Sequence, residues 1–386
     1  MNIVKSDREC NTPLRLRYQL GRHCLAIVCV LSALPDLLPG AELFTLDVCV
    51  ATDEFPRNDH QLIFPLADGR LLLVWSEYYR TSSTKSGTQR DDMPCRISRM
   101  VSSDRGRTWG EKSILQENTG LLNVKHPNLL RLPNGDVLFF FTQWNAQNER
   151  IVFKRRSNDD CRTWSEPVRV STLPGMNNIN NDHVLMLRTG RIILPSFNSP
   201  HYGQGDHWKA FCWYSDNLGE AWRVSDERMD LPKRGAEEPS IVERKDGSLL
   251  ALMRTSLGAI YRSESFDQGR TWNAPVTTLL TAPASPPCVK RIPSTNDLIV
   301  VWNHNYDETH HHQGERNPLS SAISKDDGAT WQHVKDVEFK PGGAAAYASV
   351  FFHDDEAIVS YYYQEKGFGG GSGVRLKFIP IAWFYE

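Results

Sequence analysis

The charged residues with the most informative spacing are Glu238 and Arg254, which flank an Asp246-Gly247 turn. Apolar residues lie on both sides of this turn, so the sequence predicts a β-hairpin in which Glu238 begins one strand and Arg254 ends the other. Such a hairpin brings both side chains to the same end of a sheet. A guanidinium group binds a carboxylate through two parallel hydrogen bonds. The pair is therefore either a structural salt bridge or part of a site for an acidic ligand.

The histidines and cysteines of this sequence do not have the spacing of a metal site. The three adjacent histidines His310 to His312 are followed by Gln313 and Gly314, which favours a solvated loop over a metal site. The cysteines after residue 45 are odd in number and widely scattered, without a Cys-x-x-Cys pair. They are Cys49, Cys95, Cys161, Cys212 and Cys288. We expect no disulfide framework, no metal and no organic cofactor.

The overall charge excludes two classes of partner. Lys plus Arg number 44 and Asp plus Glu number 46, which gives a net charge of -2 at pH 7. No global field therefore favours nucleic acid or an anionic membrane. After residue 45 no segment approaches about 18 consecutive apolar residues, so we expect no stable membrane insertion.

The first 41 residues differ in composition from the rest of the chain. Arg15, Arg17 and Arg22 precede an apolar run over residues 24–31, and Pro35, Pro39 and small residues follow. This order is typical of a secretory signal, so we expect residues 1–41 to be a leader and the protein to be periplasmic or extracellular. A membrane anchor or a wrongly assigned start are the alternatives. The apolar run is too short to cross a bilayer core of about 30 Å.

The strongest pattern in the chain is a repeat, Ser-x-Asp-x-Gly-x-Thr-Trp, which we call the Asp box. Its five copies begin at Ser102, Ser157, Ser215, Ser265 and Ser324. The second has Cys161 in place of glycine, and the third has Asn217 and Ala221 in place of aspartate and threonine. Ser and Asp side chains bind backbone N–H groups, Gly provides a positive φ, and Trp packs under the turn. The box therefore indicates a turn that stabilises the fold and not a catalytic element.

A second repeat alternates with the first and consists of two apolar strands around a polar turn. The turns are Asp68-Gly69, Asn134-Gly135, Thr189-Gly190, Asp246-Gly247, Asn296-Asp297 and Asp354-Asp355. Most of these six hairpins are followed by a second hairpin that carries an Asp box. The pattern predicts six sheets of about four strands each. We expect one all-β domain over residues 42–386, with few and short helices. Residues 42–50 and 374–385 should share one sheet and so close the ring.

Together, the boxes and hairpins resemble the sialidase (exo-α-neuraminidase) superfamily over residues 42–386. The resemblance implies a six-bladed β-propeller of four-stranded antiparallel blades with Asp-box turns. Asp boxes also occur in propellers that are not sialidases, so they imply the fold alone. The expected activity depends on the residues of the site.

The resemblance implies that three arginines bind the substrate carboxylate, namely Arg57, Arg254 and Arg316. Arg57 lies just before the first hairpin, where the family usually has Arg-Ile-Pro. The Arg-Ile-Pro of this chain begins at Arg291 instead, and we interpret it as the end of a strand. Arg316 precedes the last Asp box, as the third arginine does in the family.

The same resemblance implies Tyr347 as the nucleophile, Glu238 as its base and Asp92 as the general acid and base. Asp92 is preferred because Pro94 follows two places later, as often in the family, and Asp91 is the alternative. The two acids also fit a solvated surface pair. A neutral phenol suits this chemistry because the anomeric carbon of a sialoside bears a carboxylate, which would repel an anionic nucleophile.

These roles predict an exo-α-sialidase that hydrolyses terminal sialic acid from glycoconjugates with retention of configuration. One alternative is a hydrolase or lyase for another acidic sugar, whose carboxylate an arginine cluster would bind equally well. Another is a propeller that binds carbohydrate without turnover. In each case the expected partner is a sialylated or other acidic glycan. We expect residues 177–183, 200–208 and 304–314 to form the rim of the pocket.

Overall fold

The computed structural model describes residues 43–82, 90–200, 206–366 and 371–386. The chain divides into two units, residues 1–40 and 41–386, and only the second contains described residues. The expected leader over residues 1–41 lies outside the described residues. Within the described part, η1 (Ile381–Tyr385) is a short 3-10 helix, and no helix there has the length and hydrophobicity to span a membrane.

The described unit is a six-bladed β-propeller, and its first three blades follow one another in the chain. Blade 1 consists of β2 (Arg57–Pro65), β3 (Leu71–Tyr78), β4 (Cys95–Ser102) and β5 (Ser113–Gln116). Blade 2 consists of β6 (Asn123–Arg131), β7 (Val137–Ala146), β8 (Glu149–Ser157) and β9 (Val168–Arg169). Blade 3 consists of β10 (Met176–Ile179), β11 (Leu185–Met186), β12 (Ile192–Ser199), β13 (Lys209–Ser215) and β14 (Arg223–Val224).

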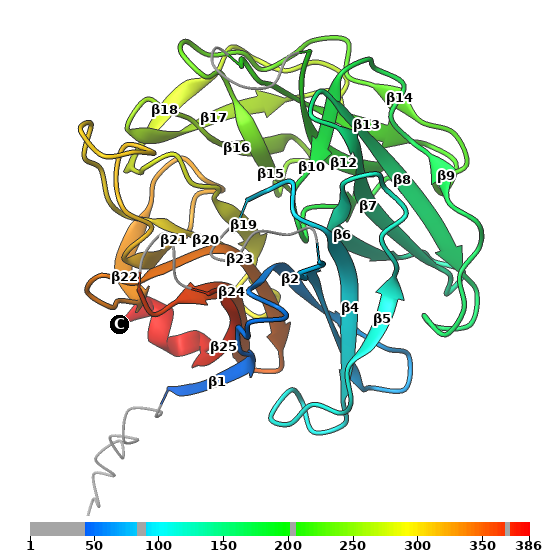
Figure 1. Cartoon of the computed structure of the whole chain (residues 1–386). Coiled ribbons are helices and arrows are strands. Elements are labelled where there is room, and N and C mark those ends of the chain that lie inside the picture. The colour runs from blue at the N-terminus through cyan, green and yellow to red at the C-terminus, as the bar shows by residue number, and fades with distance from the viewer. Residues whose placement is uncertain (1–42, 83–89, 201–205, 367–370) are drawn as a thin grey trace, which may run out of the picture. The chain divides into compact units, whose positions relative to one another are not determined.

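The remaining three blades complete the ring. Blade 4 consists of β15 (Glu237–Glu243), β16 (Leu249–Arg254), β17 (Ala259–Ser265) and β18 (Val276–Thr281). Blade 5 consists of β19 (Cys288–Arg291), β20 (Leu298–Asn303), β21 (Leu319–Ser324) and β22 (Gln332–Glu338). Blade 6 consists of β23 (Ala344–His353), β24 (Glu356–Gln364), β25 (Gly373–Pro380) and β1 (Phe44–Cys49). In Figure 1 the first strand of each blade lies toward the centre of the ring.

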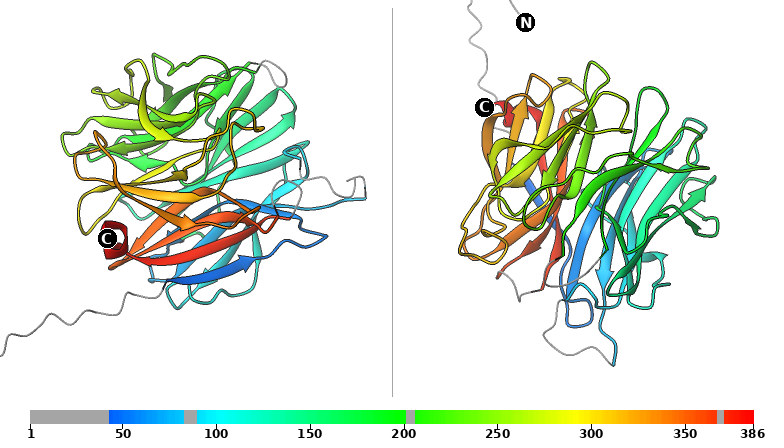
Figure 2. Two further views of the ribbon diagram at one scale, coloured as in Figure 1. Left: turned by 90° about the vertical axis from the view of Figure 1, so that its left-hand side faces the viewer. Right: turned by 90° about the horizontal axis from the view of Figure 1, so that it is seen from above.

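The ring closes as the sequence predicted, because β1 pairs antiparallel with β25. Phe44 is opposite Phe378, and the blue and red strands lie side by side in Figures 1 and 2. The expected C-terminal strand is shorter than predicted, since it ends at Pro380 and residues 381–385 form η1.

One detail of the sheets differs from the expectation of six separate ones. Blades 2 and 3 are joined into a single nine-stranded sheet through β10, which pairs in parallel with β8 at Met176 and Arg150. The reason is the short edge strand β9, which pairs with β8 only at Phe153 and Lys154. The other end of β8 is left open, and β10 docks there.

The Asp boxes form turns, as predicted. In the first box the Ser102 hydroxyl accepts a hydrogen bond from the Gly106 N–H at 2.8 Å, and the Asp104 carboxylate accepts one from the Thr108 N–H at 2.8 Å. Cys161 takes the place of glycine in the second box with a φ of 69°. Its N–H still reaches the Ser157 hydroxyl at 2.9 Å. The turn therefore survives the substitution.

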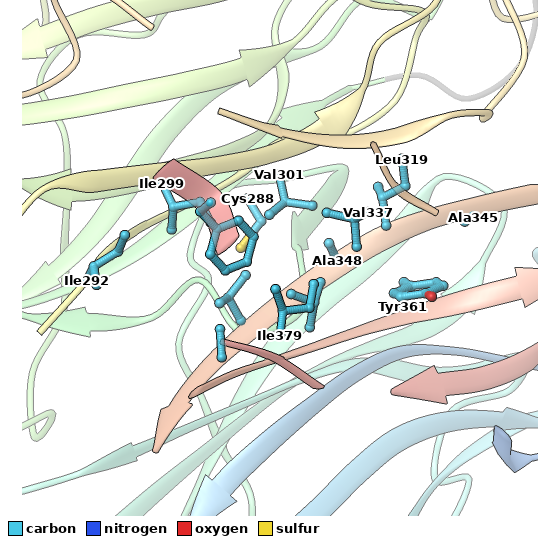
Figure 3. Packing of buried hydrophobic residues seen from close by; sticks show 14 of the residues in the cluster. Cys288, Ile292, Ile299, Val301, Leu319, Val337, Ala345, Ala348, Tyr361 and Ile379 are labelled. Atoms are coloured by element: carbon cyan, nitrogen blue, oxygen red, sulfur yellow. The ribbon is translucent and has the colours of Figure 1, made fainter. Parts of the chain in front are cut away.

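Buried apolar side chains lie between neighbouring blades. The cluster in Figure 3 joins Ile299 and Val301 of blade 5 to Ala348 and Ile379 of blade 6. A corresponding cluster fills the space between each other pair of neighbouring blades. Since burial of apolar surface stabilises a sheet on both of its faces, the blades hold one another in place and leave the axis of the ring to polar residues.

Buried amide side chains connect the inner strands across this axis. Gln61 of β2 donates through Nε2 to the carbonyl of Tyr347 at 2.7 Å, and Asn181 donates through Nδ2 to the carbonyl of Gln61 at 2.7 Å. These bonds link blades 1, 3 and 6. They also fix the backbone of Tyr347, whose side chain belongs to the site described next.

Candidate active site

A cavity of about 360 Å³ lies where the inner strands begin. Its lining includes five of the six residues that the sequence singled out, which come from blades 1, 4, 5 and 6. They are Arg57, Glu238, Arg254, Arg316 and Tyr347. The groups lie up to 290 positions apart in the chain, and the ring of blades brings them to one place.

Four inner strands direct a side chain into this cavity by the same local device. Strands β2, β6, β15 and β23 each contain a register shift, and a residue within it has a positive φ. These residues and φ angles are His60 at 51°, His126 at 62°, Glu238 at 46° and Tyr347 at 55°. All four line the cavity. A bulge redirects a side chain. A left-handed conformation costs roughly 1–2 kcal/mol for each residue other than glycine, and strain of this kind is typical of functional sites.

Tyr347 and Glu238 are hydrogen-bonded in the cavity. The Tyr347 Oη–H donates to Glu238 Oε1 at 3.1 Å, and Arg254 Nη1 donates to Glu238 Oε2 at 2.9 Å. Burial would raise the pKa of Glu238, but the charge and hydrogen bond of Arg254 lower it below its usual value. Burial and the Glu238 charge raise the pKa of Tyr347, against the charges of Arg316 and Arg254. The phenol therefore keeps its proton and directs it at an ionised carboxylate.

Arg316 lies against the ring of Tyr347 from the loop before β21. Its Cζ is 5.2 Å from the ring centroid, and its Nη1 donates to Tyr362 Oη at 3.0 Å. The Ala345 N–H donates to the carbonyl of Arg316 at 2.9 Å, which ties this loop to β23. A buried cation at this distance favours negative charge on the phenol oxygen.

Arg57 enters the cavity from the first position of β2. Its Nε donates to Asp59 Oδ2 at 2.6 Å and its Nη1 to Asp91 Oδ1 at 2.8 Å. Its Cζ lies 4.4 Å from the centroid of the Tyr78 ring. The chain therefore has an arginine in the predicted place although the Arg-Ile-Pro pattern is missing there.

The choice of Asp92 as the acid is not supported by the geometry, because Asp91 lines the cavity and Asp92 does not. Asp92 accepts hydrogen bonds from Arg90 Nη2 at 2.7 Å and Gln147 Nε2 at 3.0 Å. Asp91 is drawn inward by Arg57, and its side chain remains 53% exposed. Desolvation acts to raise the pKa of Asp91, but Lys125 and Arg57 hold it well below the usual value. Of the two neighbouring acids in the loop before Pro94, Asp91 therefore lies at the cavity and Asp92 does not.

A histidine pair beside Tyr347 was not predicted from the sequence. The His60 ring lies 4.4 Å from the Tyr347 ring and 4.3 Å from the His126 ring, centroid to centroid, and His60 Nδ1 is hydrogen-bonded to Asp59. Burial and the charge of His60 lower the pKa of His126 well below its usual value. Both histidines occupy left-handed bulges, which no glycine marks in the sequence.

The histidine cluster at 310–312 is only partly a solvated loop. His311 is exposed, whereas His312 lines the cavity. Burial, followed by the charges of Arg316 and Arg254, lowers the pKa of His312 to about 2, so its ring is neutral. Each of the three expected rim segments contributes to the lining, through Asn178, Trp208 and His312 respectively. Residues 201–205 of the second segment lie outside the described residues.

The described residues contain neither a cluster of metal-ligating side chains nor a disulfide. Among them, no group of three His, Cys, Asp or Glu side chains is arranged to hold a metal ion. All five described cysteines are buried and unpaired with one another. The polar side chains that line the cavity include carboxylates, phenols, imidazoles and cations.

Comparison with known proteins matches residues 69–359 to the BNR repeat-like domain. A protein named sialidase from Paraclostridium sordellii is 22% identical over 233 residues, which cover 54% of this chain and 55% of that protein. The match thus spans about half the length of this relative.

Several solved structures share the fold. A protein of unknown function from Dyadobacter fermentans superposes with a TM-score of 0.71 at 18% identity, over 88% of this chain and 99% of that one. The NanB sialidase from Streptococcus pneumoniae gives 0.69 at 12% identity, over 87% and 70%. A Trypanosoma rangeli sialidase in complex with sialic acid gives 0.67 at 14% identity, over 89% and 59%.

Proposed function

Because this chain belongs to the BNR repeat-like domain family of the sialidase superfamily, we propose that it is an exo-α-sialidase that uses a tyrosine nucleophile. The observation that carries the proposal is the hydrogen bond of 3.1 Å from Tyr347 to Glu238, with three arginines lining the same cavity. A phenol bonded to an ionised acid is an activated nucleophile, and the cations suit an acidic substrate.

The substrate carboxylate binds to the arginines. Arg254 gives one guanidinium nitrogen to Glu238, and its Nε, 3.9 Å from Glu237, donates to none of the described residues. Arg316 donates through Nη1 to the Tyr362 hydroxyl and carries a positive charge. Both guanidinium groups therefore favour an anion, and they place the anomeric carbon near Tyr347.

In the first chemical step the Tyr347 oxygen attacks the anomeric carbon, and its proton passes to Glu238. The bond to the leaving oxygen breaks, and Asp91 donates a proton to that oxygen. In the second step Asp91 deprotonates a water molecule, which displaces Tyr347, and Glu238 returns the proton to the phenol. Two displacements at the same carbon retain its configuration.

The low pKa of Asp91 has to rise before it can serve as an acid. In the free protein Arg57 is bonded to Asp91 at 2.8 Å. When the guanidinium turns to the substrate carboxylate, Asp91 loses the nearest cation that stabilises its charge. Substrate binding thus raises the pKa of Asp91 and prepares it for proton transfer.

The activity is tested with an aryl sialoside that releases a fluorescent phenol, assayed beside polyuronides and an uncharged galactoside. We expect the purified chain to turn over the sialoside and leave the galactoside intact. Turnover of polyuronides alone would favour the alternative of a hydrolase or lyase for another acidic sugar. Binding of a sialylated glycan without turnover would favour a carbohydrate-binding propeller.

Variants at the two neighbouring acids test which one is the acid. We expect Asp91→Asn to lower kcat/KM on sialyllactose by about 10²-fold to 10³-fold. The aryl sialoside, whose leaving phenol needs little protonation, should lose far less. Asp92→Asn, the matched control, should change either value by less than about threefold, in line with a surface pair. If Asp92→Asn showed the difference between the two substrates instead, the assignment would return to Asp92.

A further inference from the structure

The half of the cavity formed by blades 2 and 3 has no part in the steps above. It is lined by Lys125 of β6, Trp144 of β7, Arg150 of β8 and Asn178 of β10. The Lys125 Nζ lies 3.9 Å from the centroid of the Trp144 ring, and the Arg150 Cζ lies 3.3 Å from it. Two cations thus share one indole on the side of the cavity away from Arg316 and Tyr347. An indole orders such cations but does not neutralise them.

Lys125 is buried with little compensation for its charge. The residue is 2% exposed, its Nζ donates to the carbonyl of Asp91 at 3.4 Å, and it lies 4.0 Å from the Asp91 carboxylate. An ammonium has three protons, and among the described residues only this carbonyl accepts one. Burial lowers the pKa of Lys125 to about 8, with Arg150 adding to the effect and Asp91 opposing it. A buried cation of this kind is costly without a partner, which points to a ligand that supplies one.

Asn178 gives an independent indication at the same wall. Its side chain is fully buried, and neither its Oδ1 nor its Nδ2 has a hydrogen-bond partner among the described residues. Buried amides are nearly always hydrogen-bonded in folded proteins. An amide that lines a cavity and lacks a partner is available to a polar ligand.

The total charge of the cavity does not by itself require a second anion. Among its described lining residues, the cations Arg57, Lys125, Arg150, Arg234, Arg254 and Arg316 outnumber the carboxylates Asp59, Asp91, Glu237 and Glu238. A salt bridge of 3.6 Å from Arg234 to Asp206, which lies outside the lining, compensates one of the two excess positive charges. The need for a second anion therefore arises at the wall that carries Lys125 and Arg150, and not from the total charge of the cavity. The volume of about 360 Å³ is at the lower end for small-molecule sites, so both halves of the cavity face the same ligand.

We propose that the natural glycan carries a second anionic group, a carboxylate or a sulfate ester, which Lys125 and Arg150 bind and Asn178 orients across the cavity from Arg254 and Arg316. The proposal rests on the proposed function, in which a first carboxylate binds to the arginines near Tyr347. It narrows the substrate class from acidic glycans to glycans whose terminal sugar is dianionic.

Equilibrium binding to the full chain at pH 7 tests the proposal with two matched pairs of sugars. The first pair is N-acetylneuraminic acid and its sulfate esters, and the second is galactonic acid and galactaric acid, two open-chain sugar acids with one and two carboxylates. We expect the dianion to bind about tenfold more tightly than the monoanion in at least one pair. Equal affinities within both pairs would overturn the proposal. The first pair alone tests a sulfate ester and the second a carboxylate.

The two proposals fail in different ways. If the aryl sialoside is not hydrolysed but galactaric acid is preferred to galactonic acid, the sialidase assignment fails and the second anion site stands. If the sialoside is hydrolysed and neither pair shows a preference for the dianion, the sialidase assignment stands and the second anion site fails.

Variants locate the preference on the wall of blades 2 and 3. Lys125→Met keeps an apolar contact with Trp144, and we expect it to reduce the preference for the dianion to less than about threefold. Lys335→Met is the matched control, because Lys335 also lies over a tryptophan, 4.2 Å from Trp383, but outside the cavity. It should keep the full preference. An undiminished preference in Lys125→Met would overturn the role of Lys125.

The pH dependence of the unmodified protein gives a readout that needs no variant. A bound anion raises the pKa of Lys125 above the value of about 8 in the free protein. The preference for the dianion should therefore be complete below pH 8 and decline as the pH rises above it. A preference that is constant between pH 6 and pH 10 would contradict a contribution from Lys125.

Discussion

Replacement of Tyr347 by phenylalanine is expected to lower kcat for sialosides by roughly 10³-fold or more, with a much smaller change in the affinity for sialic acid. The substitution removes one oxygen atom, which is the atom that donates to Glu238 at 3.1 Å. The ring, its contact with Arg316 and the arginines remain, so the ground-state complex keeps most of its contacts. The loss should fall on the chemical step, and steady-state kinetics beside equilibrium binding would separate the two.

Tyr361→Phe is the matched control for this change. Tyr361 is also fully buried, and its Oη–H also donates to a carboxylate, that of Glu338, at 2.7 Å. It lies outside the cavity, so its loss should lower the thermal stability and leave kcat within about twofold. Turnover by Tyr347→Phe within tenfold of the unmodified protein would exclude the phenol as the nucleophile.

The local order of the propeller could be predicted from the sequence because it depends on neighbouring residues. An Asp box contains both partners of its hydrogen bonds, as Ser102 and Gly106 show. Glu238 and Arg254 are joined by one hairpin, so their proximity also follows from local structure. The pairing of β1 with β25 could be predicted for a different reason, because a ring of blades without free edges requires the two ends of the chain to pair.

The rest of the site depends on which side chains face the cavity, and this could not be read from the sequence. Asp91 and Asp92 have the same chemistry, and only the fold decides which one meets Arg57. His60 and His126 enter the cavity at bulges where the backbone is left-handed. Glycine usually marks such a position in a sequence, but these two positions are histidines. Lys125 belongs to no motif, and its role depends on Trp144 on the next strand. These residues were missed because their positions follow from tertiary contacts across the axis.

Replacement of Glu238 by glutamine is expected to lower kcat by about 10²-fold to 10⁴-fold, because the amide cannot accept the phenol proton. It should also reduce the free energy of unfolding by roughly 1–3 kcal/mol, since Arg254 loses its partner at 2.9 Å. The Glu237 carboxylate, 3.9 Å from Arg254, limits this loss. Chemical denaturation and steady-state kinetics measure the two effects on the same samples.

The variant Glu237→Gln distinguishes the role of Glu238 as a base from the effect of a negative charge beside Arg254. This variant removes an equal charge beside Arg254 but leaves the bond between Tyr347 and Glu238 intact. If Glu238 acts as the base, kcat should fall far less in Glu237→Gln than in Glu238→Gln. Equal losses would mean that the negative charge near Arg254 matters and that proton transfer to Glu238 does not.

The pH dependence distinguishes the same alternatives. Arg254 lowers the pKa of Glu238 below its usual value of about 4.3, so the carboxylate stays ionised in mildly acidic solution. Its contribution to stability is complete above pH 4.3 and is lost as the pH falls through the lowered value. The acid limb of kcat should therefore lie below pH 4.3 and should disappear in Glu238→Gln. An acid limb that persists in this variant would assign the essential carboxylate to another residue, and Asp91 is the one that lines the same cavity.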